Sequence, residues 1–193
     1  MTPAVVVPLI RRSDVVSGDV VSGLSQTADG LRRADSSDAR AIYDLICAHV
    51  DEGHLLPRHL NEVTAHVHRF IVAVDDGQVI ACADLAPLSR AVAEVRSLVV
   101  DDAARSNGIG RQLIDALIEK AERAGFEKLC AFTHAPGYFV QLGFSIVPHE
   151  WMPEKIQTDC GTCAQFRRCG QYAVMLPLTH TEHAFVPLAS LHG

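Results

Sequence analysis

The sequence lacks an excess of positive charge. Its 193 residues include 17 Lys and Arg against 23 Asp and Glu, which gives a formal net charge of −6 at pH 7. A general nucleic-acid-binding protein carries a basic stripe or tail, so we expect no nucleic-acid partner. Any anionic ligand must then be bound by a few local cations.

A long hydrophobic run is also missing. No segment is both long and apolar enough to cross a bilayer. Residues 1–10 are apolar, but Arg11 and Arg12 come after them, which is the reverse of the order in a signal peptide. We therefore expect a cytoplasmic protein without a membrane partner.

Cysteine is too sparse for a disulfide scaffold, since the chain has six. Three lie inside apolar runs, where a reduced cysteine is a small core residue: Cys47, Cys82 and Cys130. The others follow a CxxC pattern with a later third thiol: Cys160, Cys163 and Cys169. A structural zinc site usually has four ligands, and His149 could supply the fourth. The simpler interpretation is reduced thiols in a compact loop, so we predict no metal.

The length and the 48% hydrophobic content suit one domain with a single core. Residues 1–29 show no clear period and predict a flexible N-terminal extension, with at most a short strand at 5–7. Residues 30–178 form the predicted domain, and residues 179–193 a C-terminal tail. A homodimer is among the arrangements that the sequence leaves open.

Hydrophobic periodicity and turn residues predict a mixed α/β fold, with a central sheet and helices on both of its faces. The expected elements are a strand at 31–34, a helix capped by Asp35 or Ser36 and ended by Gly53, a short helix at 58–66, a hairpin of 70–74 and 78–84, a strand at 94–100, a helix with its apolar face at 113–121, a strand at 128–133, a short helix at 136–142, a strand at 144–147, an irregular stretch, and a last strand at 172–178.

The unit from 94 to 125 organises the chain. Leu98, Val99 and Val100 are continuously apolar, which is typical of a strand buried on both faces. The turn that follows contains Gly108 and Gly110 and leads directly into a helix.

This turn is suited to binding a phosphate. The first N–H groups of a helix have no partner inside the helix and lie at the positive end of its dipole. Glycine allows close approach of an anion, and Arg105 and Arg111 add charge on either side. The turn lacks the Gly-Lys-Ser/Thr of a P-loop, and Leu113 replaces the third glycine of the dinucleotide fingerprint.

The pattern RxxGxG at 105–110, between a strand and a helix, resembles the acetyl-CoA-binding motif of the GNAT N-acetyltransferases. The order of elements over about 30–178 and the segment Tyr138–Phe144 are similar to that family as well. The resemblance implies that acetyl-CoA is the co-substrate and that these residues bind it: Leu98, Val99, Val100, Arg105, Ser106, Asn107, Gly108, Ile109, Gly110, Arg111 and Thr133.

Two residues are candidates for proton transfer. Glu94 lies eleven positions before Arg105, where several GNAT enzymes carry a general base, and it shares a strand face with Arg96. The alternative is that Glu94 and Arg96 only neutralise each other. In many family members, a tyrosine five positions before the Phe of Gly-Phe acts as the general acid that protonates the leaving CoA thiolate. This chain has Phe139 at that position. The adjacent Tyr138 is then the candidate acid, unless the CoA thiolate leaves without one.

A combination of segments resembles the short, stand-alone bacterial amino-acid N-acetyltransferases of the N-acetylglutamate synthase type: 55–58, 94–98, 129–133, 138–144, 152–156 and 159–163. The resemblance implies transfer of acetyl to the α-amino group of L-glutamate or glutamine, the first step of arginine biosynthesis. A dicarboxylic substrate needs at least two cations, and the candidates are Arg58, Arg96 and Lys155. Longer members carry an amino-acid-kinase domain, so arginine feedback through such a domain is in doubt here. The alternatives are acetylation of a protein N-terminus, a lysine or a polyamine, and a non-catalytic acetyl-CoA sensor.

Overall fold

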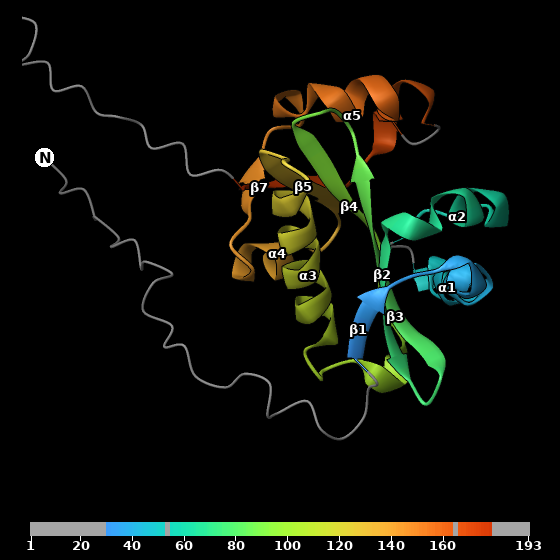
Figure 1. Cartoon of the computed structure of the whole chain (residues 1–193). Helices are drawn as coiled ribbons and strands as arrows, with labels where there is room; N and C mark the ends of the chain where they lie inside the picture. The colour runs from blue at the N-terminus through green and yellow to red at the C-terminus, as the bar shows by residue number, and fades with distance from the viewer. Residues whose placement is uncertain (1–29, 53–54, 164–165, 179–193) are drawn as a thin grey trace, which may run out of the picture.

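The computed structural model describes residues 30–52, 55–163 and 166–178 (Figure 1). Its strands are β1 (Gly30–Arg33), β2 (Phe70–Asp75), β3 (Gln78–Pro87), β4 (Val92–Val100), β5 (Lys128–Thr133), β6 (Ser145–Val147) and β7 (Tyr172–Pro177). Its α-helices are α1 (Ala39–Ala48), α2 (Leu60–His66), α3 (Ile109–Arg123), α4 (Pro136–Gln141) and α5 (Pro153–Thr158). The candidate strand at 5–7, Gly53 and the tail at 179–193 lie outside the described residues.

The strands form one seven-stranded sheet in the order β1-β2-β3-β4-β5-β7-β6. Every neighbouring pair is antiparallel except β4 and β5, which are parallel and are connected through α3. The predicted mixed α/β sheet is therefore confirmed.

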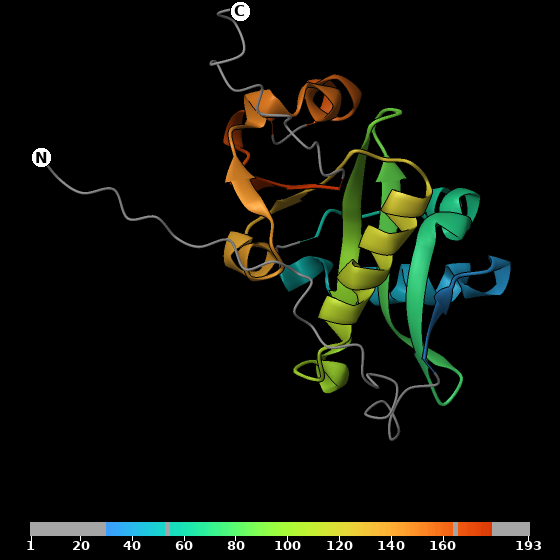
Figure 2. The same ribbon diagram turned by 60° about the vertical axis from the view of Figure 1, so that its left-hand side comes forward.

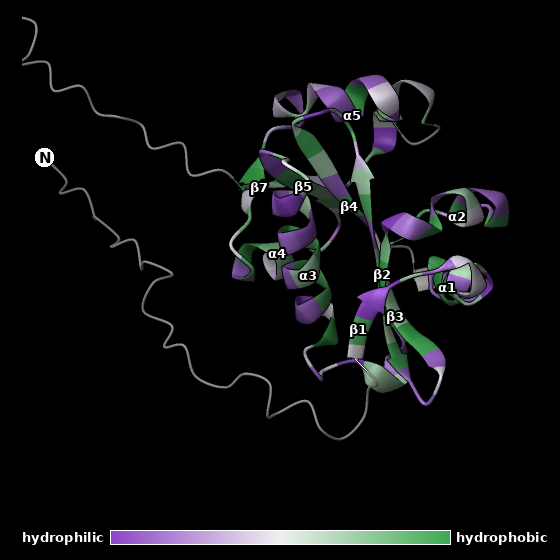
Figure 3. Ribbon diagram, in the orientation of Figure 1, coloured by the Kyte–Doolittle hydropathy of each residue, from purple (hydrophilic) through white to green (hydrophobic). Residues whose placement is uncertain are grey.

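Helices cover both faces of this sheet, as predicted (Figures 1 and 2). Ile71 and Ala73 of β2 face the side on which α3 and α4 pack, whereas the alternate residues Val72 and Val74 face α1 and α2. The predicted apolar face of α3 is fully buried: Leu113, Ile114, Leu117, Ile118 and Ala121. Figure 3 shows hydrophobic residues along the centre of the sheet and hydrophilic residues along the outer side of α3.

The sheet opens between its two parallel strands. The pairing of β4 with β5 runs from Val92 opposite Lys128 to Val95 opposite Ala131 and then stops. Beyond Val95, β4 continues to Val100 with β3 on one side and, among the described residues, no strand on the other. A β-bulge between β3 and β4 lies at the same level, and Ser97 there has a φ of 48°.

This opening corrects one expectation from the sequence. Leu98, Val99 and Val100 were expected to be buried on both faces, but only Val99 is fully buried. Leu98 and Val100 are partly exposed because β5 has already diverged from β4 at this point. The apolar run therefore lines an opening in the sheet.

Two helical segments differ from the predicted ones. Asp35 does act as a cap, but it caps a 3-10 turn at Ser36–Asp38 in a reciprocal capping box, and α1 follows this turn. The stretch predicted as irregular contains α5, with 3-10 turns on both sides of it. A helix of six residues that begins at Pro153 is too short to show a 3.6-residue period.

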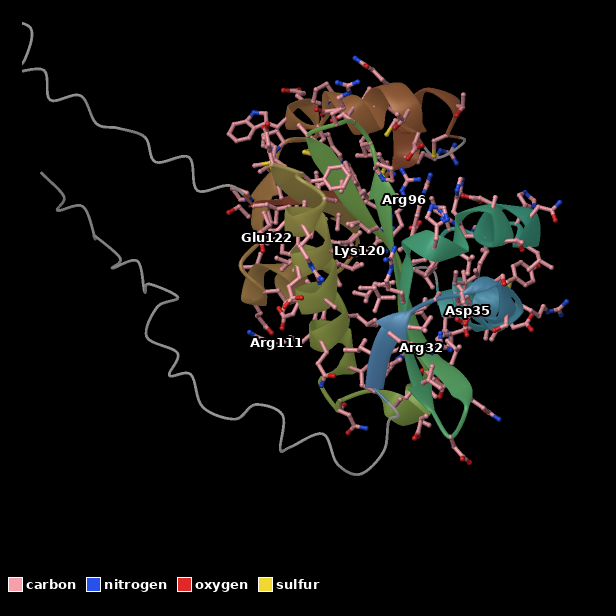
Figure 4. The ribbon with its side chains drawn as sticks, viewed as in Figure 1. Arg32, Asp35, Arg96, Arg111, Lys120 and Glu122 are labelled. Carbon is pink, nitrogen blue, oxygen red and sulfur yellow. The ribbon has the colours of Figure 1, made fainter. Side chains whose placement is uncertain are left out.

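Lys120 connects α3 to the segment before β2 through hydrogen bonds of its side chain (Figure 4). Its Nζ donates hydrogen bonds to the carbonyl oxygens of His68, at 3.2 Å, and Arg69, at 2.6 Å. Burial of the ammonium, together with repulsion from Arg33, lowers the pKa of Lys120 to about 8, although Asp84 partly offsets this.

A pH dependence of stability follows for Lys120. The folded amine loses its proton near pH 8, whereas an ordinary lysine has a pKa of 10.5. Between these values the unfolded chain binds more protons, so the stability of the parent relative to Lys120→Met should rise with pH. Urea unfolding of both proteins at pH 7.5 and 9.5 measures this difference. The exposed Lys128 provides the control Lys128→Met, for which the difference should stay flat. A flat difference for Lys120→Met as well would contradict the prediction.

Candidate active site

A cavity of about 1170 Å³ lies where the sheet opens. It is lined by β4 from Glu94 onward, by the turn that follows it and by the start of α3. Further residues come from the segment before α2, from β5, from α4 and from α5. All the predicted site residues line this cavity except Asn107.

The turn at one end of the cavity has the geometry of an anion site. Gly108 is the N-cap of α3 and adopts a left-handed φ of 77°. This conformation is costly for other residues, so the backbone favours glycine here. The N–H groups of Ile109, Gly110 and Arg111 start the helix and have no intrahelical acceptor. Both glycines and both arginines of the turn line the cavity.

Arg105 organises the turn from within. Its Nη1 lies 2.8 Å from Asp102 Oδ1, and its Nε donates to the carbonyl oxygen of Val100 at 3.1 Å. His49, the C-cap residue of α1, lies near the same carboxylate, with its Nε2 3.7 Å from Asp102 Oδ1. The side chain of His49 is buried, and its Nδ1 contacts the carbonyl oxygen of Leu45. Thus the carboxylate of Asp102, which was not predicted from the sequence, fixes the position of the motif arginine.

The open edge of β4 supplies backbone groups along the cavity. Between Arg96 and Val100 the edge that faces away from β3 has no neighbouring strand among the described residues. An extended amide-containing chain can pair with such an edge as an additional strand would. The Val100 carbonyl already accepts from Arg105, so the available groups lie nearer to the bulge at Ser97.

Two adjacent aromatic residues on α4 point in different directions, Phe139 into the core and Tyr138 into the cavity. Phe139 is 6% exposed and packs edge to face against Phe144 at 5.3 Å between ring centroids. Tyr138 directs its hydroxyl toward Gly110, where a Cβ added to the glycine would lie 2.7 Å from that oxygen. Burial and the nearby Asp115 raise the pKa of Tyr138, which keeps the phenol protonated at neutral pH. The Tyr138 hydroxyl therefore lies beside the anion-binding turn that contains Gly108 and Gly110.

A four-residue charge cluster occupies the other end of the cavity, consisting of Glu94, Arg96, Lys155 and Asp159. Glu94 Oε2 accepts from Arg96 Nε at 2.6 Å, and Lys155 Nζ lies 2.7 Å from Glu94 Oε1. Asp159 Oδ2 accepts from Lys155 Nζ at 2.8 Å and also from Arg96 Nη2. The structure thus brings together three residues predicted from the sequence and adds Asp159. Figure 4 shows Arg96 between the ribbons of α2 and α5.

Arg58 forms a separate ion pair beside this cluster. Its Nη2 donates to Asp84 Oδ2 at 3.1 Å, and its Nη1 lies 3.3 Å from Glu62 Oε1. Asp84 is 1% exposed, and burial raises its pKa although Arg58 partly offsets this effect. Asp84 Oδ1 and Arg58 Nε have no hydrogen-bond partner among the described residues. Asp84 was missed in the sequence, although a lone carboxylate inside the apolar run of β3 is a detectable signal.

The three late cysteines also line the cavity, and all are free thiols. His149 also lines the cavity and stacks on Phe132, with ring centroids 5.6 Å apart. In the part of the chain that the structure describes, no group of three or more His, Cys, Asp or Glu side chains is arranged to bind a metal ion. Within the same residues, no helix has the length and apolar composition needed to span a lipid bilayer.

An anion-binding helix start, an open strand edge and a cluster of paired charges therefore meet in one cavity. This arrangement defines a protein that binds a ligand with a phosphate group and an extended arm, beside a second, charged site.

Comparison with known proteins gives the family. The Acetyltransferase (GNAT) family pattern matches residues 37–144. The chain belongs to this family and is an acetyl-CoA-dependent N-acetyltransferase.

Three relatives illustrate the similarity. The chain is 32% identical to the uncharacterized N-acetyltransferase CT2212 of Chlorobaculum tepidum over 77% of its own length and 96% of the relative. It is 30% identical to the amino-acid acetyltransferase of Pectobacterium carotovorum over 68% of its length, which is 30% of that protein. N-acetylglutamate synthase from Neisseria gonorrhoeae, complexed with coenzyme A and N-acetyl-glutamate, superposes with a TM-score of 0.71 and 26% identity over 78% of this chain and 35% of that one. The chain thus spans about a third of the length of these two larger proteins.

Proposed function

We propose that this protein transfers the acetyl group of acetyl-CoA to the α-amino group of L-glutamate, or of a close relative such as glutamine, at the entry to arginine synthesis. The observation that carries the proposal is the convergence of Arg58, Arg96 and Lys155, from three separate segments of the chain, on the cavity that also contains the donor turn. The amino-acid acetyltransferases and N-acetylglutamate synthase among its relatives support the same acceptor class.

The donor would lie along β4 and the turn that leads into α3. Its pyrophosphate would be bound by the N–H groups at the start of α3, with Arg105 and Arg111 beside them. Its pantetheine arm would pair with the open edge of β4 near Ser97 and Leu98. We assign Tyr138 to packing against the donor near Gly110, because its hydroxyl lies at the phosphate end and the thioester sulfur belongs at the far end of the arm.

The acceptor would enter from the side of the charge cluster. An ammonium has no lone pair, so the α-amino group must lose a proton before it attacks the thioester carbonyl. We propose Glu94 as the base, acting through a water because its oxygens already accept from Arg96 and Lys155. Backbone N–H groups at the bulge would polarise the thioester carbonyl, and the CoA thiolate would leave without a protein acid.

The charged residues of the cavity favour an acidic acceptor over a polyamine or a lysine side chain. A polyamine or a lysine side chain needs a free carboxylate opposite its second cation. Four carboxylates line the described cavity, and three of them are already paired with an arginine or lysine: Glu62, Glu94 and Asp159. The fourth, Glu150, is exposed. A substrate with carboxylates can instead share the N–H donors of those cations, because a guanidinium has five.

Free-thiol release from acetyl-CoA, measured across amino acids, polyamines and peptides, tests this proposal. We expect the highest kcat/KM with L-glutamate or L-glutamine. If thiol is released only with peptides or polyamines, the acceptor is one of these and not glutamate or glutamine. An absence of amine-dependent release with every acceptor would support the non-catalytic sensor.

Arg58→Lys is the sharpest substitution for the acceptor side, because it keeps the charge beside Asp84 while removing the bidentate guanidinium. Loss of a charge-assisted contact typically costs about 1.5–3 kcal/mol, so KM for glutamate should rise by about ten-fold or more with KM for acetyl-CoA unchanged. Arg40→Lys, at an exposed pair with Asp44 on α1, is the matched control and should change neither constant. A parental KM for glutamate in Arg58→Lys would remove Arg58 from the acceptor site.

A further inference from the structure

Asp159 stands at the end of α5 and reaches into the charge cluster. Its Oδ2 accepts from both cations of the cluster, Lys155 Nζ and Arg96 Nη2. Glu94 accepts from Arg96 Nε and from Lys155 Nζ, with contacts of 2.6 to 2.9 Å. Two carboxylates thus share two cations, and the cluster is electrically balanced.

The two carboxylates are not equivalent. Glu94 lies on the central strand β4, and its side chain is 4% exposed. Asp159 is the C-cap of a six-residue helix, and its side chain is 36% exposed. Burial opposes its charge, but Lys155 and Arg96 outweigh burial and lower the pKa of Asp159, so it is ionised at neutral pH. Glu94 is therefore a fixed partner, and Asp159 is the partner that can move out toward solvent.

We propose that Asp159 occupies the position of the substrate's side-chain carboxylate between Arg96 and Lys155, and that an acidic substrate displaces it on binding. This inference rests on the proposed acetylation of a small acidic amino acid. The exchange of one carboxylate for another leaves both cations paired, so it avoids the cost of an uncompensated buried charge. A neutral side chain cannot make this exchange, because Asp159 would have to leave without a replacement.

Asp159 is thereby a specificity-determining residue. It weakens the binding of every acceptor that uses Arg96 and Lys155, since each must compete with an internal carboxylate. It also favours a carboxylate over an amide at this position, because only a carboxylate restores the balance of charge. The α-carboxylate would remain with Arg58, whose pairing with Asp84 lies outside this exchange.

Asp159→Asn tests the inference, because it keeps the size of the side chain and removes the competing charge. A partly exposed ion pair is worth up to about 1 kcal/mol, so KM for L-glutamate should fall by about fivefold, with KM for acetyl-CoA unchanged. Glu154→Gln, five residues earlier on the same helix and outside the cluster, is the matched control and should change neither constant. An unchanged or raised KM for glutamate in a folded Asp159→Asn protein would overturn the inference.

A binding measurement separates this inference from the proposed function. Glutarate carries two carboxylates and no amine, so calorimetric titration with glutarate reports on the anion position without catalysis. Tighter glutarate binding by Asp159→Asn than by the parent supports the exchange even if glutamate is not acetylated. If glutamate is acetylated while glutarate binds both proteins equally, the proposed function stands and the exchange is refuted.

Discussion

Gly108→Val is expected to weaken acetyl-CoA binding by at least about ten-fold. Gly108 has a φ of 77°, and a Cβ added there would meet no heavy atom within 4 Å, so the effect comes from the backbone and not from a clash. A left-handed conformation costs an L-residue roughly 1–2 kcal/mol, and the turn should relax away from it. The N–H groups of Ile109, Gly110 and Arg111 would then no longer converge on one anion.

Gly77 provides a matched control for this experiment. It also has a left-handed φ, 75°, and open space around its Cβ position, but it lies in the β2–β3 hairpin and does not line the cavity. Gly77→Val should lose a similar amount of thermal stability and bind acetyl-CoA like the parent in calorimetry. Parental affinity in Gly108→Val would show that this turn does not bind the donor.

Glu94→Gln is expected to reduce the turnover number by about 100-fold or more, since general-base catalysis typically contributes roughly 10²–10⁴-fold. The acidic limb of the pH–rate profile should flatten, while the affinity for acetyl-CoA stays the same. The measurement is the rate of thiol release with saturating glutamate between about pH 5.5 and 9. Glu119→Gln, which removes an exposed carboxylate paired with Arg123 on α3, is the control for the loss of one negative charge.

The same variant separates the two roles considered for Glu94. Its oxygens accept from Arg96 and Lys155, so a purely positioning role is the alternative to proton transfer. In that case Glu94→Gln would raise KM for glutamate, lower the melting temperature and leave the shape of the pH–rate profile unchanged. That combination of results would reject Glu94 as the base.

The donor side of the site was predictable because its residues are consecutive. The strand, the turn with Gly108 and Gly110, and the apolar face of α3 all lie within one stretch of chain, and each has a local sequence signal. The left-handed φ at Gly108 and the buried face of α3 are those that the pattern requires. The break in pairing between β4 and β5 was not predictable, since it depends on where a strand distant in the sequence diverges.

The acceptor side depends on contacts between segments that lie far apart in the sequence. Arg96 and Asp159 are 63 positions apart, and Arg58 and Asp84 are 26 positions apart. No local period reports such pairs, so the cations could be proposed from the sequence, whereas their pairing with Asp84 and Asp159 could not. The orientation of Tyr138 relative to Phe139 likewise depends on how the short helix α4 packs.

The short contact between β4 and β5 divides the sheet into two leaves, whose strands pair at four positions, Val92–Val95 with Lys128–Ala131. The ion pairs of Glu94 with Lys155 and of Arg96 with Asp159 also link the two leaves. Arg58 belongs to the leaf that carries α1 and α2, whereas Lys155 and Asp159 stand over the leaf that carries β5, β7 and β6. An acyl donor bound in the gap would contact both leaves and would fix the distance between Arg58 and Lys155. The groups that bind the acceptor would then be correctly spaced only after the donor has bound. We therefore expect an ordered sequence of binding, with acetyl-CoA first and the amino acid second.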